Sequence, residues 1–195
     1  MASSEEVLSF WLDEIGPDGW YKGGAELDAG IKARFEADWN RAMEGSYALW
    51  LTYPSGALAY IILTDQLSRN MFRNTAGAFA SDHVSLAAAK LSIAHGFDLR
   101  IDEPARQFFY LPLMHSECLT DQDRCVRLIK TRLPETGASN LVHARAHREV
   151  IRRFGRFPTR NAALSRANSS AEAAYLEGGG YGAILRELEA EPQTA

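Results

Sequence analysis

The chain is poor in cysteine, with only Cys118 and Cys125 among its 195 residues. Their spacing is not that of a C-x-x-C motif. Two cysteines are too few for a disulfide framework or for a cysteine-ligated zinc site. We therefore interpret both as ordinary thiols that pack like small apolar side chains.

Long apolar runs are also missing. No stretch approaches the roughly 18 uninterrupted apolar residues of a membrane-spanning helix. The N-terminal residues Ser3 to Glu6 lack the basic start and the apolar run of a secretory signal. We therefore expect a cytoplasmic protein with no membrane segment. The net charge of -4 disfavours nucleic-acid binding by the surface as a whole.

Several motifs of catalysis and nucleotide binding are absent from the sequence. There is no G-x-S-x-G elbow, no H-E-x-x-H, no G-x-x-x-x-G-K-[ST] loop and no G-x-G-x-x-G that opens a helix. We accordingly expect no cofactor and no metal site.

Helical periodicity dominates what is present, and 46% of the residues are hydrophobic, as in a globular protein. The pattern predicts one all-α domain over residues 1–195, built as an array of stacked antiparallel helix pairs with a frayed tail after about residue 190. A capping-box spacing joins Ser169 and Glu172. The expected helices span residues 7–12, 27–44, 55–72, 82–95, a segment from about 104, 121–133, 138–154 and 181–189.

Charged residues interrupt the apolar face of the helix expected at 55–72. Asp65 and Arg69 fall in the middle of that face, and Arg73 falls near its edge. Asp65 and Arg69 are four residues apart, so they can pair. Buried charges must be paired, hydrogen-bonded or directed into a wet cavity. Two interpretations stay open, a structural ion-pair network between helices and a polar pocket that binds a ligand.

Basic side chains and histidines gather later in the chain. Seven arginines lie between Arg145 and Arg166, with Glu149 as the one acidic residue among them. Arginine grips carboxylate or phosphate with two parallel hydrogen bonds. His143 and His147 have H-x-x-x-H spacing, but a metal would need a further ligand such as His115 or Glu117. We favour His115 and His147 as buried, hydrogen-bonded histidines or as acid/base groups.

Four motifs occur in one order: VLSFWL at 7–12, DQLSRNMFR at 65–73, FFYLPLMHSE at 108–117 and RFGRFPTRN at 153–161. Together they resemble the bacterial domain-of-unknown-function family nine-two-four from about residue 7 to residue 181. The resemblance implies an all-helical fold similar to tetratricopeptide-repeat proteins, and it implies no activity.

The chain departs from the family pattern at four positions. Family members often carry Phe-Pro where this chain has Leu67 and Ser68, His where it has Thr159, and Gly where it has Ser165. This chain therefore lacks the histidine that family members often carry just before Arg160. The positions that match are Asp65, Gln66, Arg69, Asn70, Arg73, His115, Ser116, Glu117, His147, Arg156, Arg160 and Asn161.

The favoured hypothesis is a binding module that takes a small anionic molecule or an acidic peptide in an internal pocket or groove lined by arginine and histidine. Four arginines then grip the anion: Arg69, Arg73, Arg156 and Arg160. Two carboxylates, Asp65 and Glu117, orient the arginines. Four polar residues also contribute to the site: Gln66, Asn70, Ser116 and Asn161.

The alternative is an enzyme of hydrolase or transferase type. His115 or His147 is then the general base, Glu117 its orienting partner, and the arginines clamp an oxyanion. Nucleic-acid binding by the arginine-rich segment is disfavoured, since Phe154 and Phe157 are more simply core residues. The sequence predicts no oligomeric state.

Overall fold

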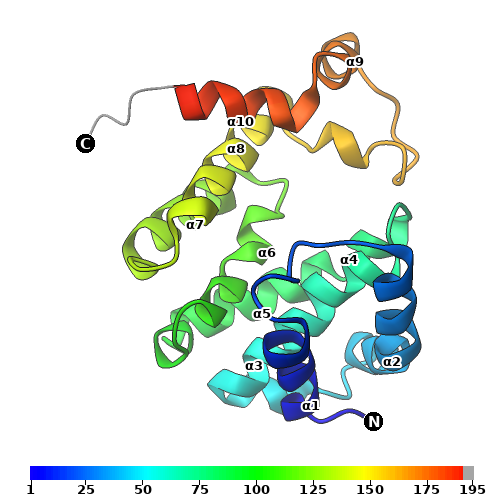
Figure 1. Cartoon of the computed structure of the whole chain (residues 1–195), viewed down its shortest axis with the longest axis vertical. Helices are drawn as coiled ribbons and strands as arrows, with labels where there is room; N and C mark the ends of the chain where they lie inside the picture. The colour runs from blue at the N-terminus through cyan, green and yellow to red at the C-terminus, as the bar shows by residue number, and fades with distance from the viewer. Residues whose placement is uncertain (191–195) are drawn as a thin grey trace. The chain divides into compact units, whose positions relative to one another are not determined.

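The computed structural model describes residues 1–190, without the side chain of Glu189, and this part of the chain contains helices and no strand (Figure 1). The predicted all-α class is therefore confirmed. None of the helices in this range is long and apolar enough to cross a membrane. The expected frayed tail lies outside the described residues.

The chain divides into two compact units, unit 1 at Met1–Pro112 and unit 2 at Leu113–Ala195. A single domain over 1–195 and the tetratricopeptide-like arrangement both stay predictions. The short helix α6 (Leu111–Met114) contains the boundary. A helix that begins near Pro104 was expected, but a 3₁₀ turn at Ala105–Phe109 precedes α6. Pro112 has no N–H to continue that turn, and it suits the first turn of a new helix.

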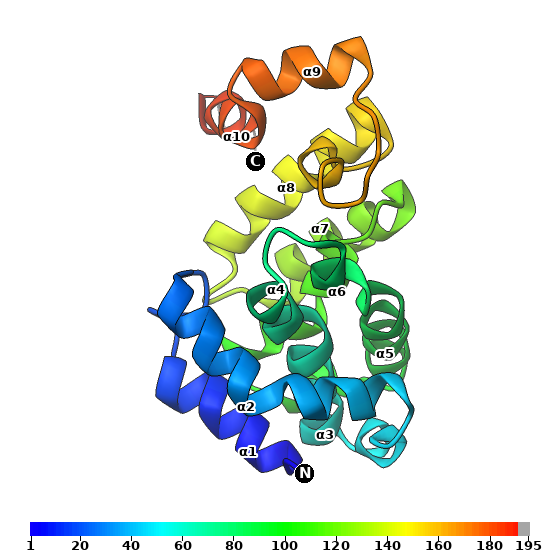
Figure 2. The same ribbon diagram turned by 90° about the vertical axis from the view of Figure 1, so that its right-hand side faces the viewer.

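Unit 1 is built around α3, whose residues Gly56–Ile61 are all buried. Helix α3 packs against α1 and α5, while α2 packs against α4 (Figure 2). The α-helices of this unit are α1 (Ser4–Leu8) with a π-helical continuation at Ser9–Ile15, α2 (Ala25–Met43), α3 (Pro54–Ile61), α4 (Ser68–Met71) and α5 (Asp82–Ala94). Three further 3₁₀ turns lie at Ala48–Thr52, Ala76–Phe79 and Asp98–Arg100.

The helix expected at 55–72 is one helical run with a π-helical segment, Ile62–Leu67, between α3 and α4. A wide π turn changes which backbone groups pair along the helix. The buried hydroxyls of Ser68 and Ser81 donate to the carbonyl of Thr64, at 3.0 and 2.5 Å. Side chains therefore stabilise the irregular turn that carries Asp65 and Gln66, a feature that helical periodicity did not reveal.

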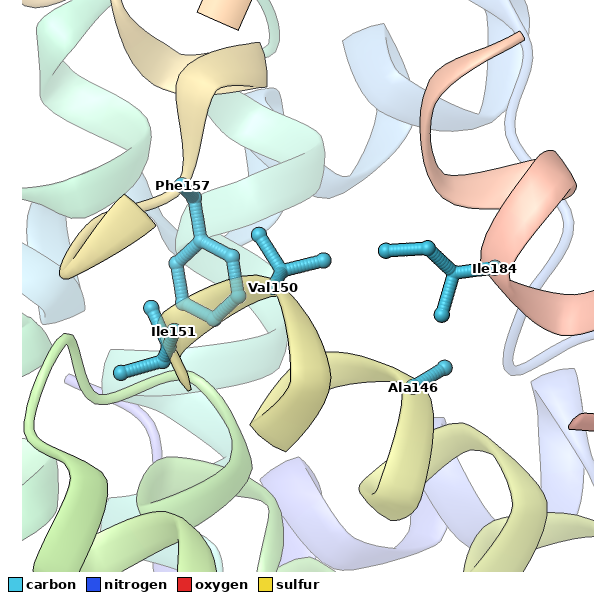
Figure 3. Packing of buried hydrophobic residues seen from close by; sticks show 5 residues of the cluster. All are labelled: Ala146, Val150, Ile151, Phe157 and Ile184. Atoms are coloured by element: carbon cyan, nitrogen blue, oxygen red, sulfur yellow. The ribbon is translucent and has the colours of Figure 1, made fainter. Parts of the chain in front are cut away.

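Unit 2 is organised by α8 (Ala138–Phe154), which packs against α7 (Leu119–Arg132) and α10 (Gly180–Ala190). Figure 3 shows Ala146, Val150 and Ile151 of α8 in its core together with Phe157 and Ile184. Helix α8 has the predicted bounds and ends at Gly155, whose φ of 68° is the left-handed conformation that glycine adopts without strain.

The segment after α8 contains a 3₁₀ turn at Pro158–Arg160 and leads to α9 (Ser170–Glu177). The predicted capping box of Ser169 and Glu172 is confirmed. Ser165 has a φ of 54°, also in the left-handed region. A side chain is disfavoured there, which gives a physical reason for the glycine that family members often carry at this position.

Candidate functional site

The sequence-predicted residues fall into one set per unit. Unit 1 contains Asp65, Gln66, Arg69, Asn70 and Arg73, and unit 2 contains His115, Ser116, Glu117, His147, Arg156, Arg160 and Asn161. Each set is described within its own unit.

The first set centres on Asp65, whose side chain is fully buried. The Nη2 of Arg69 donates to the Oδ1 of Asp65 at 3.2 Å and to the Oδ1 of Asp82 at 2.9 Å. The Gln66 amide donates to the other oxygen of Asp65. The predicted inward position of the Asp65–Arg69 pair is confirmed. Asp82, the first residue of α5, is the second carboxylate on Arg69.

Asn70 and Arg73 share a different carboxylate, that of Asp28 on α2. The Arg73 Nε and Nη2 donate to its two oxygens at 2.5 and 2.9 Å, and the Asn70 amide donates at 2.8 Å. The hydrogen bonds from Arg73 hold the pKa of Asp28 below its usual value, although partial burial opposes this. Gly23 allows the approach, because a Cβ there would lie 2.9 Å from the Arg73 Nη2.

These contacts favour the structural interpretation of unit 1. Arg69 links its helical run to α5, and Arg73 links it to α2, each through carboxylates of the chain itself. The sequence analysis missed Asp28 and Asp82, and no local pattern marks them, because each is far along the chain from its arginine.

In unit 2, Glu117 is held by Arg166 and by a backbone amide. The two carboxylate oxygens accept hydrogen bonds from Arg166 Nη1 and Nη2 at 2.7 and 2.9 Å, and the N–H of Phe157 donates at 2.8 Å. Burial alone would raise the pKa of Glu117, but these hydrogen bonds lower it below its usual value. Arg166 also donates to the Asn161 side chain at 2.9 Å, so Glu117 and Asn161 fix the segment after α8.

Arg156 and Ser116 also have partners within the chain. The Arg156 Nε and Nη2 grip both oxygens of Glu172 in the capping box of α9, at 2.6 and 2.8 Å. The Ser116 hydroxyl donates to Asp121 at 2.9 Å, near the start of α7. Both of these predicted ligand-binding residues therefore stabilise helix termini.

Three other predicted residues meet around the ring of Phe157. The guanidinium carbon of Arg160 lies 4.4 Å from the Phe157 ring centroid, and the ring of His147 lies 5.5 Å from it, edge to face. The ring of His115 lies 6.3 Å from that of His147, and Arg160 donates to the His115 carbonyl at 2.8 Å. We call His115, His147, Phe157 and Arg160 the histidine–arginine cluster. Its two histidines and Arg160 each retain some accessible surface.

Hydrogen bonds fix which nitrogen of His147 carries the proton. The Nδ1 lies 2.8 Å from the carbonyl oxygen of His143 and 3.1 Å from the hydroxyl of Tyr181. A carbonyl oxygen only accepts, so Nδ1 is the protonated nitrogen and Nε2 carries the lone pair. Burial, followed by the neighbouring His115, lowers the pKa of His147 to about 3, which keeps its ring neutral at physiological pH. Within the described residues, Nε2 has no hydrogen-bond partner.

Tyr181 and His143 are functional candidates that the sequence analysis did not select. The Tyr181 hydroxyl also lies 2.8 Å from Nδ1 of His143, so α10 contacts both histidines of α8. The H-x-x-x-H spacing placed the two histidines on one face, but no local signal brings Tyr181 to them. Among residues 1–190, no group of three His, Cys, Asp or Glu side chains is placed to hold a metal ion.

Comparisons with known proteins agree with these motifs. A family model described as a bacterial protein of unknown function, DUF924, matches residues 7–180. A solved structure of a protein of unknown function from Agrobacterium tumefaciens is 36% identical, with a TM-score of 0.84, over 90% of this chain and 97% of that one. No curated protein matches the chain. The resemblance inferred from the four motifs is confirmed, and the chain belongs to the bacterial family DUF924, whose function is unknown.

Proposed function

We propose that this protein is a binding module that takes a small anionic molecule at the histidine–arginine cluster of unit 2. The observation that carries the proposal is the meeting of Arg160, His115 and His147 around one aromatic ring, with the Nε2 of His147 unpartnered among the described residues. A cationic guanidinium stacked on an aromatic face is suited to hold a carboxylate or phosphate.

The other predicted arginines support this choice by contrast. Arg73 and Arg156 each place two nitrogens on one carboxylate of the chain, and Arg69 is shared by two carboxylates. An incoming anion would have to displace a charged partner at each of these sites. These three arginines are therefore poorer candidates for an anion site.

Two observations disfavour the enzyme alternative. Glu117, expected to orient a catalytic histidine, has both oxygens engaged by Arg166 and by the N–H of Phe157. A histidine with a pKa of about 3 is a poor general base near neutral pH. The cluster is therefore better suited to hold a ligand than to remove its proton.

The arginine-rich segment also supports a small ligand over nucleic acid. Arg152 and Arg153 pair with Glu149, Arg153 also pairs with Glu187, and Arg148 lies 3.5 Å from Asp123. Acidic neighbours weaken attraction to phosphate backbones. We also propose a cytoplasmic location, which suits the free thiols of Cys118 and Cys125.

Calorimetric titration with phosphate, acetate, succinate, malate, citrate and a pentaglutamate peptide tests the proposal. We expect at least one of the small anions to bind wild type, and Arg160→Gln to weaken it about tenfold, which corresponds to about 1.4 kcal/mol. Arg145→Gln is the matched control, because it also removes one arginine charge. Arg145 lies on α8 two positions before His147, so its side chain is about 200° around the helix from that of His147.

Three outcomes would contradict the proposal. These are the absence of binding by every anion, equal weakening by Arg160→Gln and Arg145→Gln, and binding of the peptide alone. The last outcome would favour an acidic protein partner. Circular dichroism of both variants shows whether a loss of binding reflects a loss of fold.

A further inference from the structure

Helix α7 carries a row of basic side chains on its solvent side. It packs against α8 (Figure 1), and its opposite face is buried. Arg124, Arg127 and Lys130 are spaced three residues apart, so they lie within about 120° of one another around the helix. Arg127 and Lys130 are exposed, and Arg124 is half-buried. We call these three residues the basic face of α7.

No carboxylate among the described residues neutralises the basic face, and its three side chains have no hydrogen bond or ion pair there. Asp123, one turn before Arg127, lies 3.5 Å from the Nη1 of Arg148 on α8 instead. Most arginines elsewhere have a carboxylate partner, among them Arg34 and Arg166. The chain has a net charge of -4, so acidic residues are in excess, and this face is still left uncompensated.

Stabilisation of α7 itself does not explain the basic face. Basic side chains stabilise the last turn of a helix through its dipole, and this accounts for Lys130 and Arg132. Arg124 and Arg127 lie in the middle of the helix, where the dipole contributes little. Neither of them pairs with a carboxylate one turn away, as a stabilising helix pair would. Their charges therefore suit a partner of opposite sign.

The surroundings of the basic face favour a short acidic peptide over nucleic acid or a membrane. From Arg124 to Lys130 the face is about 9 Å long, about the length of three extended residues. The described part of unit 2 exposes no aromatic ring on which a single-stranded base could stack. Its one exposed large apolar side chain is Leu119, too little to insert into a membrane. Asp123, 54% exposed beside the face, weakens attraction to a phosphate backbone.

We propose that the basic face of α7 is a docking surface for an acidic segment of a partner protein, with carboxylates paired to Arg124, Arg127 and Lys130. A guanidinium binds a carboxylate through two parallel hydrogen bonds. Pairs between exposed charges are screened by salt, so the binding is salt-dependent. The face shares no residue with the histidine–arginine cluster, so its role does not depend on the proposed function.

Fluorescence anisotropy of a labelled pentaglutamate peptide tests the proposal. We expect wild type to bind the peptide at about 50 mM NaCl and more weakly at about 200 mM. Arg127→Gln combined with Lys130→Gln should weaken binding about tenfold, since one exposed pair contributes up to about fivefold. Arg100→Gln combined with Lys22→Gln is the matched control. It removes one arginine and one lysine from exposed positions of unit 1 that have no ion pair among the described residues.

Three results would overturn the docking surface. The first is no binding of the peptide by wild type at low salt. The second is equal weakening by the two double variants, which would show that only net charge matters. The third is tighter binding of a short DNA duplex, or of vesicles with phosphatidylserine, that the α7 variant loses.

Two further comparisons keep the test decisive. Circular dichroism checks the fold of both double variants. If the α7 variant does not fold, Lys130→Gln against Lys22→Gln gives the same comparison with a single exposed lysine. If no small anion binds wild type while the peptide does, the proposed function is wrong and the docking surface stands.

Discussion

The two units contain similar sets of charged side chains and use them differently. In unit 1, Arg69 and Arg73 have carboxylates of the chain as partners, and the resulting network joins α2, α4 and α5, while the buried Nε of Arg69 has no hydrogen-bond partner among the described residues. In unit 2, Glu117 and Arg166 form an equally closed pair, but the adjacent His147 leaves its Nε2 unpartnered among the described residues. Both units therefore contain a polar atom without a hydrogen-bond partner among the described residues, and unit 2 differs in placing two histidines beside its arginine.

The largest expected effect is on the buried pair of unit 1. Arg69→Ala leaves Asp65 fully buried without its guanidinium, and we expect it to lower the free energy of unfolding by about 3–5 kcal/mol. Arg73→Ala removes a side chain that is 44% exposed and should cost about 1 kcal/mol or less. Urea unfolding measures both. Equal costs would show that burial does not distinguish the two arginines.

A smaller effect is expected at the closed pair of unit 2. Glu117→Gln removes charge-assisted hydrogen bonds to Arg166 and should cost about 1.5–3 kcal/mol at pH 7. Because the folded protein lowers the pKa of Glu117, the carboxylate stabilises the fold above its unfolded pKa of about 4.5, and this stability is lost as the pH falls through the lower, folded pKa.

Urea unfolding as a function of pH checks this second prediction. The difference between wild type and Glu117→Gln should be constant above about pH 6 and should shrink as the pH falls below about 4.5. A difference that grows in acid would show that Glu117 has a raised pKa in the folded protein.

A change at Tyr181 separates the stability of unit 2 from the chemistry of its cluster. Tyr181→Phe removes the hydroxyl contacts to His143 and His147 and should cost about 1 kcal/mol. The proton of His147 should stay on Nδ1, since the His143 carbonyl still holds it. Side-chain ¹⁵N NMR checks this, and a shift of the proton to Nε2 would mean that Tyr181 sets the tautomer.

The smallest effect is expected at Ser165. Ser165→Gly relieves a left-handed backbone conformation and adds freedom to the unfolded chain, so the two effects partly cancel. We expect a change between zero and about 1 kcal/mol of stabilisation, while the β-branched Ser165→Val should destabilise by about 1–2 kcal/mol. Thermal unfolding compares the two variants. Equal stability would show that the backbone of residue 165 is not strained.

Local patterns predicted much of the fold and part of the site. The bounds of α8 and the capping box of α9 followed from glycine positions and side-chain spacing, and the Asp65–Arg69 pair followed from helical geometry. The π-helical segment at Ile62–Leu67 did not follow, because its stabilising hydroxyl from Ser81 comes from beyond the helix.

Long-range partners decided the roles of the candidate residues. Asp28 is 45 residues from Arg73, and Glu117 is 49 from Arg166. Tyr181 reaches His143 from α10 across 38 residues. Periodicity and motif spacing carry no information about such pairs, so the sequence could name charged candidates without identifying the residues that pair with them.

The most direct test of the central claim is backbone NMR of the ¹⁵N-labelled protein during titration with malate, acetate and phosphate. We predict that amide signals of His115, Phe157 and Arg160 move on binding, while those of Arg69 and Arg73 stay in place. Shifts centred on Arg69 and Arg73, or no shift with any of these anions, would contradict the assignment of the ligand site to the histidine–arginine cluster.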